Sequence, residues 1–310
     1  MATIAKERAA LTAPPRRRQR GTSWSAWIWI APAVILLLLF FVYPFIYTIV
    51  LSVTNSDFLG NITSFVGFKH YQFVFTDPGM LEVLKNNLIW LVVATILTVG
   101  LGLIVAYLVD RVRVEALVKS MLFIPMAISA VAAGIIWRFV YVYRPEGDTQ
   151  IGLLNAILGI FHVAPQAFVQ NPSVSTFALI VVYVWIWTGF CMVILSAALK
   201  GIPDEVIEAA KMDGAGRVTM FLRITVPMIA PTLGEVVTTM VINILKIFDI
   251  VYLMTGGNYG TNVVAMAFYQ NEFLNQNYGV GSALAVLLTL VILPVMVINV
   301  RRMRAEEKMR

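Results

Sequence analysis

The sequence has little charge. Aspartate, glutamate, lysine and arginine make up only 13% of its 310 residues, whereas 59% of the residues are hydrophobic. Soluble globular domains average about 25% charged and 45–50% apolar residues. Because so few charges cannot cover a surface in water, we expect most of this surface to face lipid. The net charge of +6 then indicates anchoring at a membrane and not nucleic-acid binding, since the basic residues flank apolar stretches and form no single patch.

Cysteine and histidine are also scarce. The single cysteine, Cys191, lies in an apolar run, which excludes a disulfide within the chain and is typical of a small buried hydrophobic residue. His70 and His162 are far apart in sequence, and no metal-ligand pattern surrounds either. No G-x-x-x-x-G-K-[S/T] phosphate loop and no nucleophile–base set occurs. We therefore predict no enzyme, no catalytic residue, no metal and no cofactor bound by this chain, so that any energy from ATP enters through another polypeptide.

Long apolar runs dominate what the sequence does contain. A bilayer core requires about 20 mostly apolar residues per helix. Six segments meet this length, at roughly 27–53, 88–109, 117–142, 174–199, 229–254 and 278–300. The first is too long for a cleaved signal peptide, whose apolar core has about 7–15 residues. The predicted fold class is therefore an all-α membrane protein with six transmembrane helices.

Basic residues are distributed unevenly among the connections between these segments. The two tails and the second and fourth connections carry 18 lysines and arginines, whereas the remaining connections carry only Lys69, Lys85 and Arg144. Because lysine and arginine are enriched in cytoplasmic loops, both termini are predicted to be cytoplasmic. The expected organisation is a basic tail at 1–25, a transmembrane domain at 26–300 with a cytoplasmic loop at 200–227, and a second tail at 301–310.

The loop at 200–227 is polar and has helix-forming signals. Pro203 fits the first turn of a helix, where its missing N–H costs nothing. Asp204 and Glu205 then lie where the helix dipole favours negative charge. Gly214 is predicted to end this helix, and a second short helix is predicted to stop at Pro227. An ordinary interfacial hairpin is the alternative to a docking surface for a protein outside the lipid.

The loop contains a spaced motif made of Glu208, Ala209, Ala210, Asp213, Gly214 and Ala215. Phe221, Ile224 and Pro227 follow it. This pattern resembles the EAA loop of binding-protein-dependent ABC importer permeases. The resemblance implies that this helix pair enters a cleft of an ATP-hydrolysing subunit and transmits the closure of that subunit. It also implies the type I ABC importer permease fold and a multi-pass position in a prokaryotic cell membrane.

The same resemblance implies a set of partners. They are a second permease subunit, two ATP-binding subunits that hold ATP and Mg²⁺, and an extracytoplasmic solute-binding protein. Sugar and membrane lipid complete the expected contacts, and nucleic acid is not among them.

Polar residues within the third and fifth spans indicate a substrate pathway, because charged groups inside a membrane are costly. Asn243, Lys246 and Asp249 recur three residues apart on one helix face. A self-neutralising pair of Lys246 and Asp249 is the alternative interpretation. Pro125 interrupts the third span and is predicted to leave backbone groups near Met126 and Ser129 free to serve a cavity.

The stretches 125–137 and 245–252 resemble carbohydrate-importing permeases of the maltose and alpha-glucoside type. In the fourth span, Trp187 could stack on a sugar ring, with helix packing as the alternative. The resemblance and these patterns together predict substrate contacts at Met126, Ser129, Ala130, Trp187, Thr188, Gly189, Met192, Asn243, Lys246 and Asp249.

The predicted function is a permease subunit of an ATP-driven importer for an oligosaccharide or alpha-glucoside. An ion-coupled secondary transporter, with Lys246 and Asp249 as coupling residues, is the alternative. Such transporters usually contain internal repeats, and none is found in this sequence.

Overall fold

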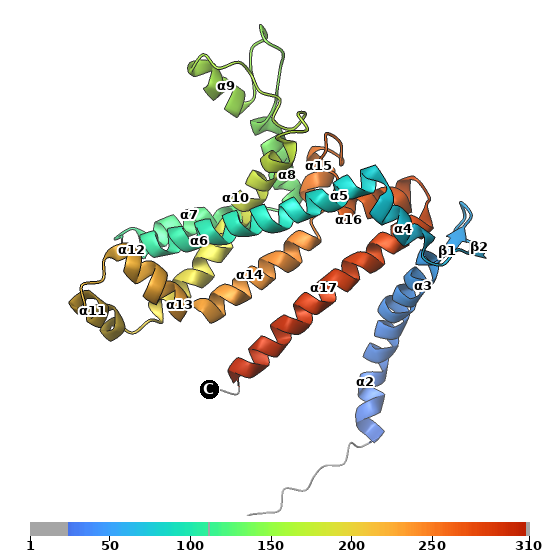
Figure 1. Ribbon diagram of the computed structural model, residues 1–310, viewed down its shortest axis with the longest axis horizontal. Helices are drawn as coiled ribbons and strands as arrows, with labels where there is room; N and C mark the ends of the chain where they lie inside the picture. Colours follow the sequence, from blue (N-terminus) through green and yellow to red (C-terminus); the bar gives the residue numbers. More distant parts are fainter. Residues whose placement is uncertain (1–23, 111, 308–310) are drawn as a thin grey trace, which may run out of the picture. The chain divides into compact units, whose positions relative to one another are not determined.

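The computed structural model describes residues 24–110 and 112–307, whose helices and strands are shown in Figure 1. The chain divides into two compact units, Met1–Tyr47 and Thr48–Arg310. The predicted basic tail at 1–25 lies almost entirely outside the described residues, as does the end of the tail at 301–310.

The first unit contains an apolar helix. Helix α2 (Trp24–Leu37) passes through the π-helical turn η1 (Leu38–Val42) into α3 (Tyr43–Ser52), the end of which belongs to the second unit. The rings of Tyr43 and Tyr47 stack one turn apart, with centroids separated by 6.3 Å. Large apolar side chains are exposed along both α2 and η1. A helix that is hydrophobic all round is typical of a membrane span.

Four helical stretches in the described part of the chain are long and apolar enough to cross a membrane, and the number rises to six if two bent pairs each form one span. The unbroken stretches are Trp29–Ser52, Pro78–Val109, Ser175–Lys200 and Tyr278–Arg301. The 101° bend lies inside the third predicted span, whereas the 75° bend lies between Met228 and Ala230, where the fifth predicted span begins. The helical fold class is as predicted, but the third expected span is broken at its bend and the fifth is broken at 246–248.

A short hairpin and a long helical stretch open the second unit. Strands β1 and β2 pair antiparallel. Asp77 then caps α5 by accepting a hydrogen bond from the Met80 amide at 3.0 Å, and Pro78 occupies the first turn. The elements in order are β1 (Thr54–Ser56), β2 (Ile62–Phe65), α4 (Lys69–Thr76), α5 (Pro78–Ile89), η2 (Trp90–Ala94) and α6 (Thr95–Val109).

The third predicted span consists of α7 (Glu115–Ala127) and α8 (Ala130–Val140). Pro125 lies in the last turn of α7, as the sequence indicated, and Ile128 is extended with φ −83° and ψ 136°. The Ser129 hydroxyl then starts α8 by accepting a hydrogen bond from the Ala132 amide at 3.2 Å. The break between α7 and α8 follows from these two residues, because proline weakens the helix and serine caps the next one.

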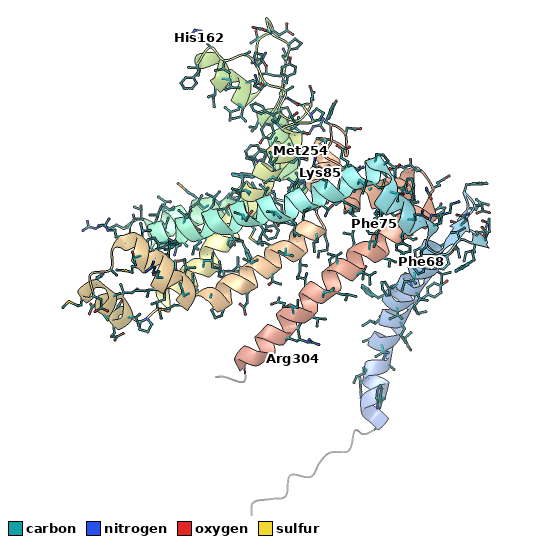
Figure 2. The ribbon with its side chains drawn as sticks, in the orientation of Figure 1. Phe68, Phe75, Lys85, His162, Met254 and Arg304 are labelled. Carbon is teal, nitrogen blue, oxygen red and sulfur yellow. The ribbon has the colours of Figure 1, made fainter. Side chains whose placement is uncertain are left out.

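Helix α10 (Ser175–Lys200) lies in the centre of the second unit and packs against α6 and α7. Glycine permits both contacts. A Cβ atom built on Gly102 would lie 2.6 Å from the Cβ of Cys191, and one built on Gly189 would lie 2.0 Å from the Leu122 carbonyl oxygen. Before α10, the short helix α9 (Leu153–Ile160) precedes His162 in the connection from α8 (Figure 2).

The loop at 200–227 leads into the fifth predicted span. The second short helix ends at Met228, one residue after Pro227, which agrees with the predicted stop. One expectation about this region was wrong, because the expected helix at 229–254 is interrupted at 246–248. The elements are α11 (Asp204–Met212), α12 (Arg217–Met220), η3 (Phe221–Thr225), α13 (Val226–Met228), α14 (Ala230–Leu245) and α15 (Asp249–Met254).

The last elements are α16 (Val264–Tyr269), η4 (Gln270–Leu274) and the long α17 (Tyr278–Glu307). The Gly260 carbonyl, in the loop before α16, accepts hydrogen bonds from Asn86 at 2.8 Å and Thr176 at 3.1 Å. These bonds attach the loop to α5 and α10.

Candidate functional site

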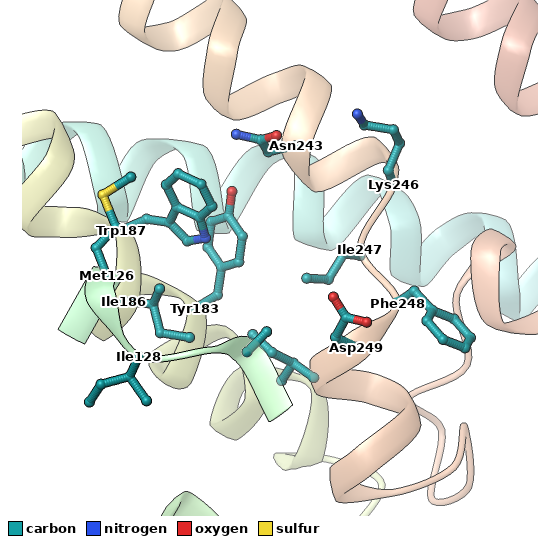
Figure 3. Close-up of a pocket in the computed structure, with 12 residues that line it drawn as sticks. Met126, Ile128, Tyr183, Ile186, Trp187, Asn243, Lys246, Ile247, Phe248 and Asp249 are labelled. Atoms are coloured by element: carbon teal, nitrogen blue, oxygen red, sulfur yellow. The ribbon is translucent and has the colours of Figure 1, made fainter. Parts of the chain in front are cut away.

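A cavity of about 370 Å³ lies where the α7–α8 break, the middle of α10 and the α14–α15 break meet (Figure 3). It is lined by Met126, Ile128 and Ala130 from the first break, Tyr183, Ile186 and Trp187 from α10, and Asn243, Lys246, Ile247, Phe248, Asp249 and Ile250 from the second break. Interrupted helices are tolerated at membrane depth where their backbone lines a cavity. The α7–α8 break and the α14–α15 break are therefore expected to lie beside the same cavity.

Aromatic rings form one wall of this cavity. Tyr183 and Trp187 are one helical turn apart on α10, with ring centroids separated by 6.0 Å and planes inclined by 30°. Phe190 packs edge-on against Trp187 at 5.8 Å from the other side. Trp187 is thus held between two neighbouring rings, and its orientation toward the cavity is fixed by packing.

Polar groups form the opposite wall. Asn243, Lys246 and Asp249 line the cavity, and Figure 3 shows them around the α14–α15 break. None of the three ion pairs in the described part of the chain includes Lys246 or Asp249. The self-neutralising pair considered from the sequence is therefore not formed, because the break turns these residues away from the helical register that would bring them together. Their hydrogen-bonding groups are available to a ligand.

The structure brings together six of the ten predicted substrate contacts. These six line the cavity: Met126, Ala130, Trp187, Asn243, Lys246 and Asp249.

The other four predicted contacts lie outside the cavity lining. Ser129 caps α8, and the Thr188 hydroxyl donates to the Val184 carbonyl at 2.6 Å. Gly189 packs against the backbone of α7, and Met192 is fully buried in the core. For the three residues on α10 the cause is the helix period of 3.6 residues, because a different side of α10 faces the cavity, whereas the hydroxyl of Ser129 is used to cap α8.

Tyr183, Ile186 and Phe248 line the cavity and were missed from the sequence. Tyr183 could have been predicted from the sequence. It precedes Trp187 by four residues, and residues four apart lie on the same face of a helix. No comparable signal exists for Phe248, which reaches the cavity only through the helix break.

The second candidate site is the loop at 200–227, where α11 presents a polar surface. Val206 and Ile207 are half-buried and Ala210 is buried, whereas Glu208 and Lys211 are exposed. Of the six motif residues, Glu208, Ala209, Asp213 and Gly214 are exposed, and Ala210 and Ala215 pack inward. Part of the motif therefore lies on the surface of the hairpin, and the rest packs within it.

Gly214 makes the turn between α11 and α12. Its φ of +79° is in the left-handed region, which favours glycine. The next amide, Ala215 N–H, donates to the Ala210 carbonyl at 3.0 Å and closes the end of the helix. Beside this turn, the Met212 side chain is 88% exposed, which the sequence analysis did not anticipate.

The chain matches a family of transport-system membrane components. The family model described as "Binding-protein-dependent transport system inner membrane component" matches residues 63–304, and the chain belongs to this family. It is therefore a membrane transport component and not an enzyme.

Individual relatives agree with the family. The chain is 53% identical to the osmoprotective compounds uptake permease protein GgtC of Synechocystis sp., over 91% of this chain and 100% of the relative. It is 41% identical to the alpha-glucoside transport system permease protein AglF of Rhizobium meliloti, over 94% of this chain and 86% of the relative. A subunit in a crystal structure of a bacterial ABC transporter for alginate import has the same fold, with a TM-score of 0.74, 22% identity and coverage of 91% and 96%.

Proposed function

We propose that this chain is a permease subunit of an ATP-driven importer that carries a glucoside or short oligosaccharide across the inner membrane. The observation that carries the proposal is the cavity, in which Tyr183 and Trp187 face Asn243, Lys246 and Asp249, and neither charged residue forms an ion pair within the described part of the chain. The relative named for alpha-glucoside transport supports the same substrate class.

The two walls of the cavity suit the two kinds of surface on a sugar. An aromatic face can stack on the apolar C–H face of a pyranose ring, and here Trp187 is held in place by Tyr183 and Phe190. The amide of Asn243 and the side chains of Lys246 and Asp249 offer donors and acceptors to hydroxyl groups. Ligand pockets typically combine a mostly apolar lining with a few such polar groups.

The loop at 200–227 supplies the connection to ATP. In this proposal the loop and both termini are cytoplasmic, as the distribution of lysine and arginine indicates. α11 then docks on one of two ATP-binding subunits, and a second permease subunit and a solute-binding protein complete the transporter. ATP binding closes the ATP-binding subunits, α11 moves with them, and the cavity opens outward to receive sugar. Hydrolysis reverses the movement.

The test is reconstitution of the chain with its partner subunits in lipid vesicles. Alpha-glucosides delivered by the binding protein are expected to stimulate ATP hydrolysis and to enter the vesicles only when ATP is present. Uptake driven by an ion gradient without ATP would instead support the ion-coupled alternative, in which Lys246 and Asp249 carry the coupling ion.

A further inference from the structure

A group of charged side chains joins the ends of three helices directly before α11. The Lys119 ammonium donates to Asp110 Oδ1 and to Glu115 Oε1, both at 2.6 Å. The Ser196 hydroxyl donates to the same Asp110 oxygen at 2.6 Å, and Lys119 also contacts Ser196. Lys200 forms an ion pair with Glu115. We call these five residues the helix-end network.

The network connects three different elements. Asp110 follows α6, Glu115 and Lys119 belong to the first two turns of α7, and Ser196 and Lys200 belong to the last two turns of α10. Directly after Lys200 the chain enters α11 through only three residues. A movement of α11 therefore pulls on the end of α10, where Lys200 and Ser196 of the network lie.

Partial burial distinguishes the centre of the network from an ordinary surface ion pair. The side chains of Lys119 and Asp110 are 18% and 14% exposed, whereas that of Lys200 is 54% exposed. Asp110 Oδ2 is buried and has no hydrogen-bond partner among the described residues, so Lys119 and Ser196 compensate the carboxylate through Oδ1. Exposed pairs contribute little, but removing one partner of a buried pair leaves an uncompensated charge.

Helix α7 runs from this network to the cavity. Its first residue is Glu115 and its last turn contains Met126, which lines the cavity. The 13 residues of α7 span about 20 Å at 1.5 Å per residue. Figure 1 shows α11 near the end of α7 that lies away from α8. A rigid element thus connects the neighbourhood of the docking loop with the α7–α8 break.

We propose that the helix-end network is a positioning device that makes α7 follow α11. α7 packs against α10 and approaches it closely where Leu122 meets Gly189. Apolar packing is not directional, whereas the ion pairs and hydrogen bonds of the network fix the start of α7 to the end of α10. Movement at the α10–α11 junction therefore reaches the α7–α8 break and changes the cavity. This inference rests on the proposed function, because it assigns a path for the coupling that the proposed function requires.

The test compares lysine variants in the complete transporter reconstituted with its partner subunits. Lys119→Met removes the central cation and is expected to reduce the number of sugars imported per ATP hydrolysed about tenfold, within the usual range of coupling between sites. ATP hydrolysis itself is expected to continue. Lys119→Arg retains the charge and is expected to restore most of the coupling. Lys85→Met is the control, because Lys85 is exposed on α5 and forms no ion pair in the described part of the chain (Figure 2).

A second variant separates positioning from assembly. If Lys119→Met fails to assemble, Asp110→Asn combined with Lys119→Met removes the uncompensated carboxylate. The double variant is expected to assemble and to remain uncoupled. A parental ratio of sugar to ATP in Lys119→Met, or in an assembled double variant, would overturn the inference. Absence of ATP-driven uptake in the parental complex would instead count against the proposed function, so the two failures are distinguishable.

Discussion

At the scale of single residues, different sides of α10 carry residues that line the cavity and residues that pack against other helices. Tyr183 and Trp187 lie on the side that faces the cavity, whereas Gly189 and Met192 lie on sides that face other helices. The sequence presents all four in one aromatic and small-residue cluster, so their roles could not be told apart before the helix had neighbours. Two substitutions on this helix test the separation.

Trp187→Ala is expected to weaken sugar binding about fivefold, which corresponds to ~1 kcal/mol of lost aromatic contact. Equilibrium binding of a radiolabelled alpha-glucoside to the purified transporter without its binding protein measures this directly. Trp185→Ala is the matched control, because Trp185 contacts Trp137 at 5.8 Å and is absent from the cavity lining. Equal binding by the two variants would remove Trp187 from the site.

Gly189→Ala is expected to act on stability and not on sugar recognition. The added methyl group would lie 2.0 Å from the Leu122 carbonyl oxygen, and overpacking of this kind costs about 1–3 kcal/mol. A lower Tm of the detergent-solubilised chain is therefore expected. Gly100→Ala, in α6, is the control because nothing lies within 4 Å of its Cβ position. An unchanged Tm for Gly189→Ala would contradict the close contact between α7 and α10.

At the scale of elements, helix breaks could be predicted where a single residue causes them. Pro125 marked the α7–α8 break in advance, because proline acts on its own helix. The break at 246–248 contains no proline or glycine. It exists because Ile247 is buried in the core and Phe248 packs on Tyr252 and Tyr269, with centroids 5.2 and 5.3 Å away. Tertiary contacts of this kind leave no local signal, and the polar wall of the cavity depends on them.

The turn after α11 provides a matched pair of glycines for testing the docking loop. Gly214 has a φ of +79° and Gly216 a φ of −68°, and neither Cβ position has a neighbour within 4 Å. Gly214→Ala is therefore strained by its backbone alone, at a cost of ~1–2 kcal/mol. It is expected to reduce ATP-dependent uptake while the chain still reaches the membrane, and Gly216→Ala is expected to transport normally. Full uptake by Gly214→Ala in vesicles would argue against a role for the turn in docking.

At the scale of the whole molecule, the membrane character and the helical class could be predicted because they depend on composition and on long apolar runs. The placement of the substrate contacts could be predicted only in part. Met126 and Asn243 are far apart in sequence and meet only because two broken spans converge on α10. A pattern read along one helix gives the face on which a residue lies, but it does not identify which neighbouring element covers that face.

The direction in which the chain crosses the membrane remains to be tested as a prediction of the lysine and arginine distribution, and the single cysteine makes the test simple. Cys191, a residue of α10, is fully buried against α6, so the parental protein is expected to resist a membrane-impermeant maleimide. Lys211→Cys places a thiol at an exposed position of α11, and Asp148→Cys places one in the exposed connection between α8 and α9. The first is expected to react only in inverted vesicles and the second in intact spheroplasts. The reverse pattern would place α11 on the outer side, where no ATP-binding subunit could reach it. The docking role of the loop would then be wrong, and so would the positioning role of the helix-end network.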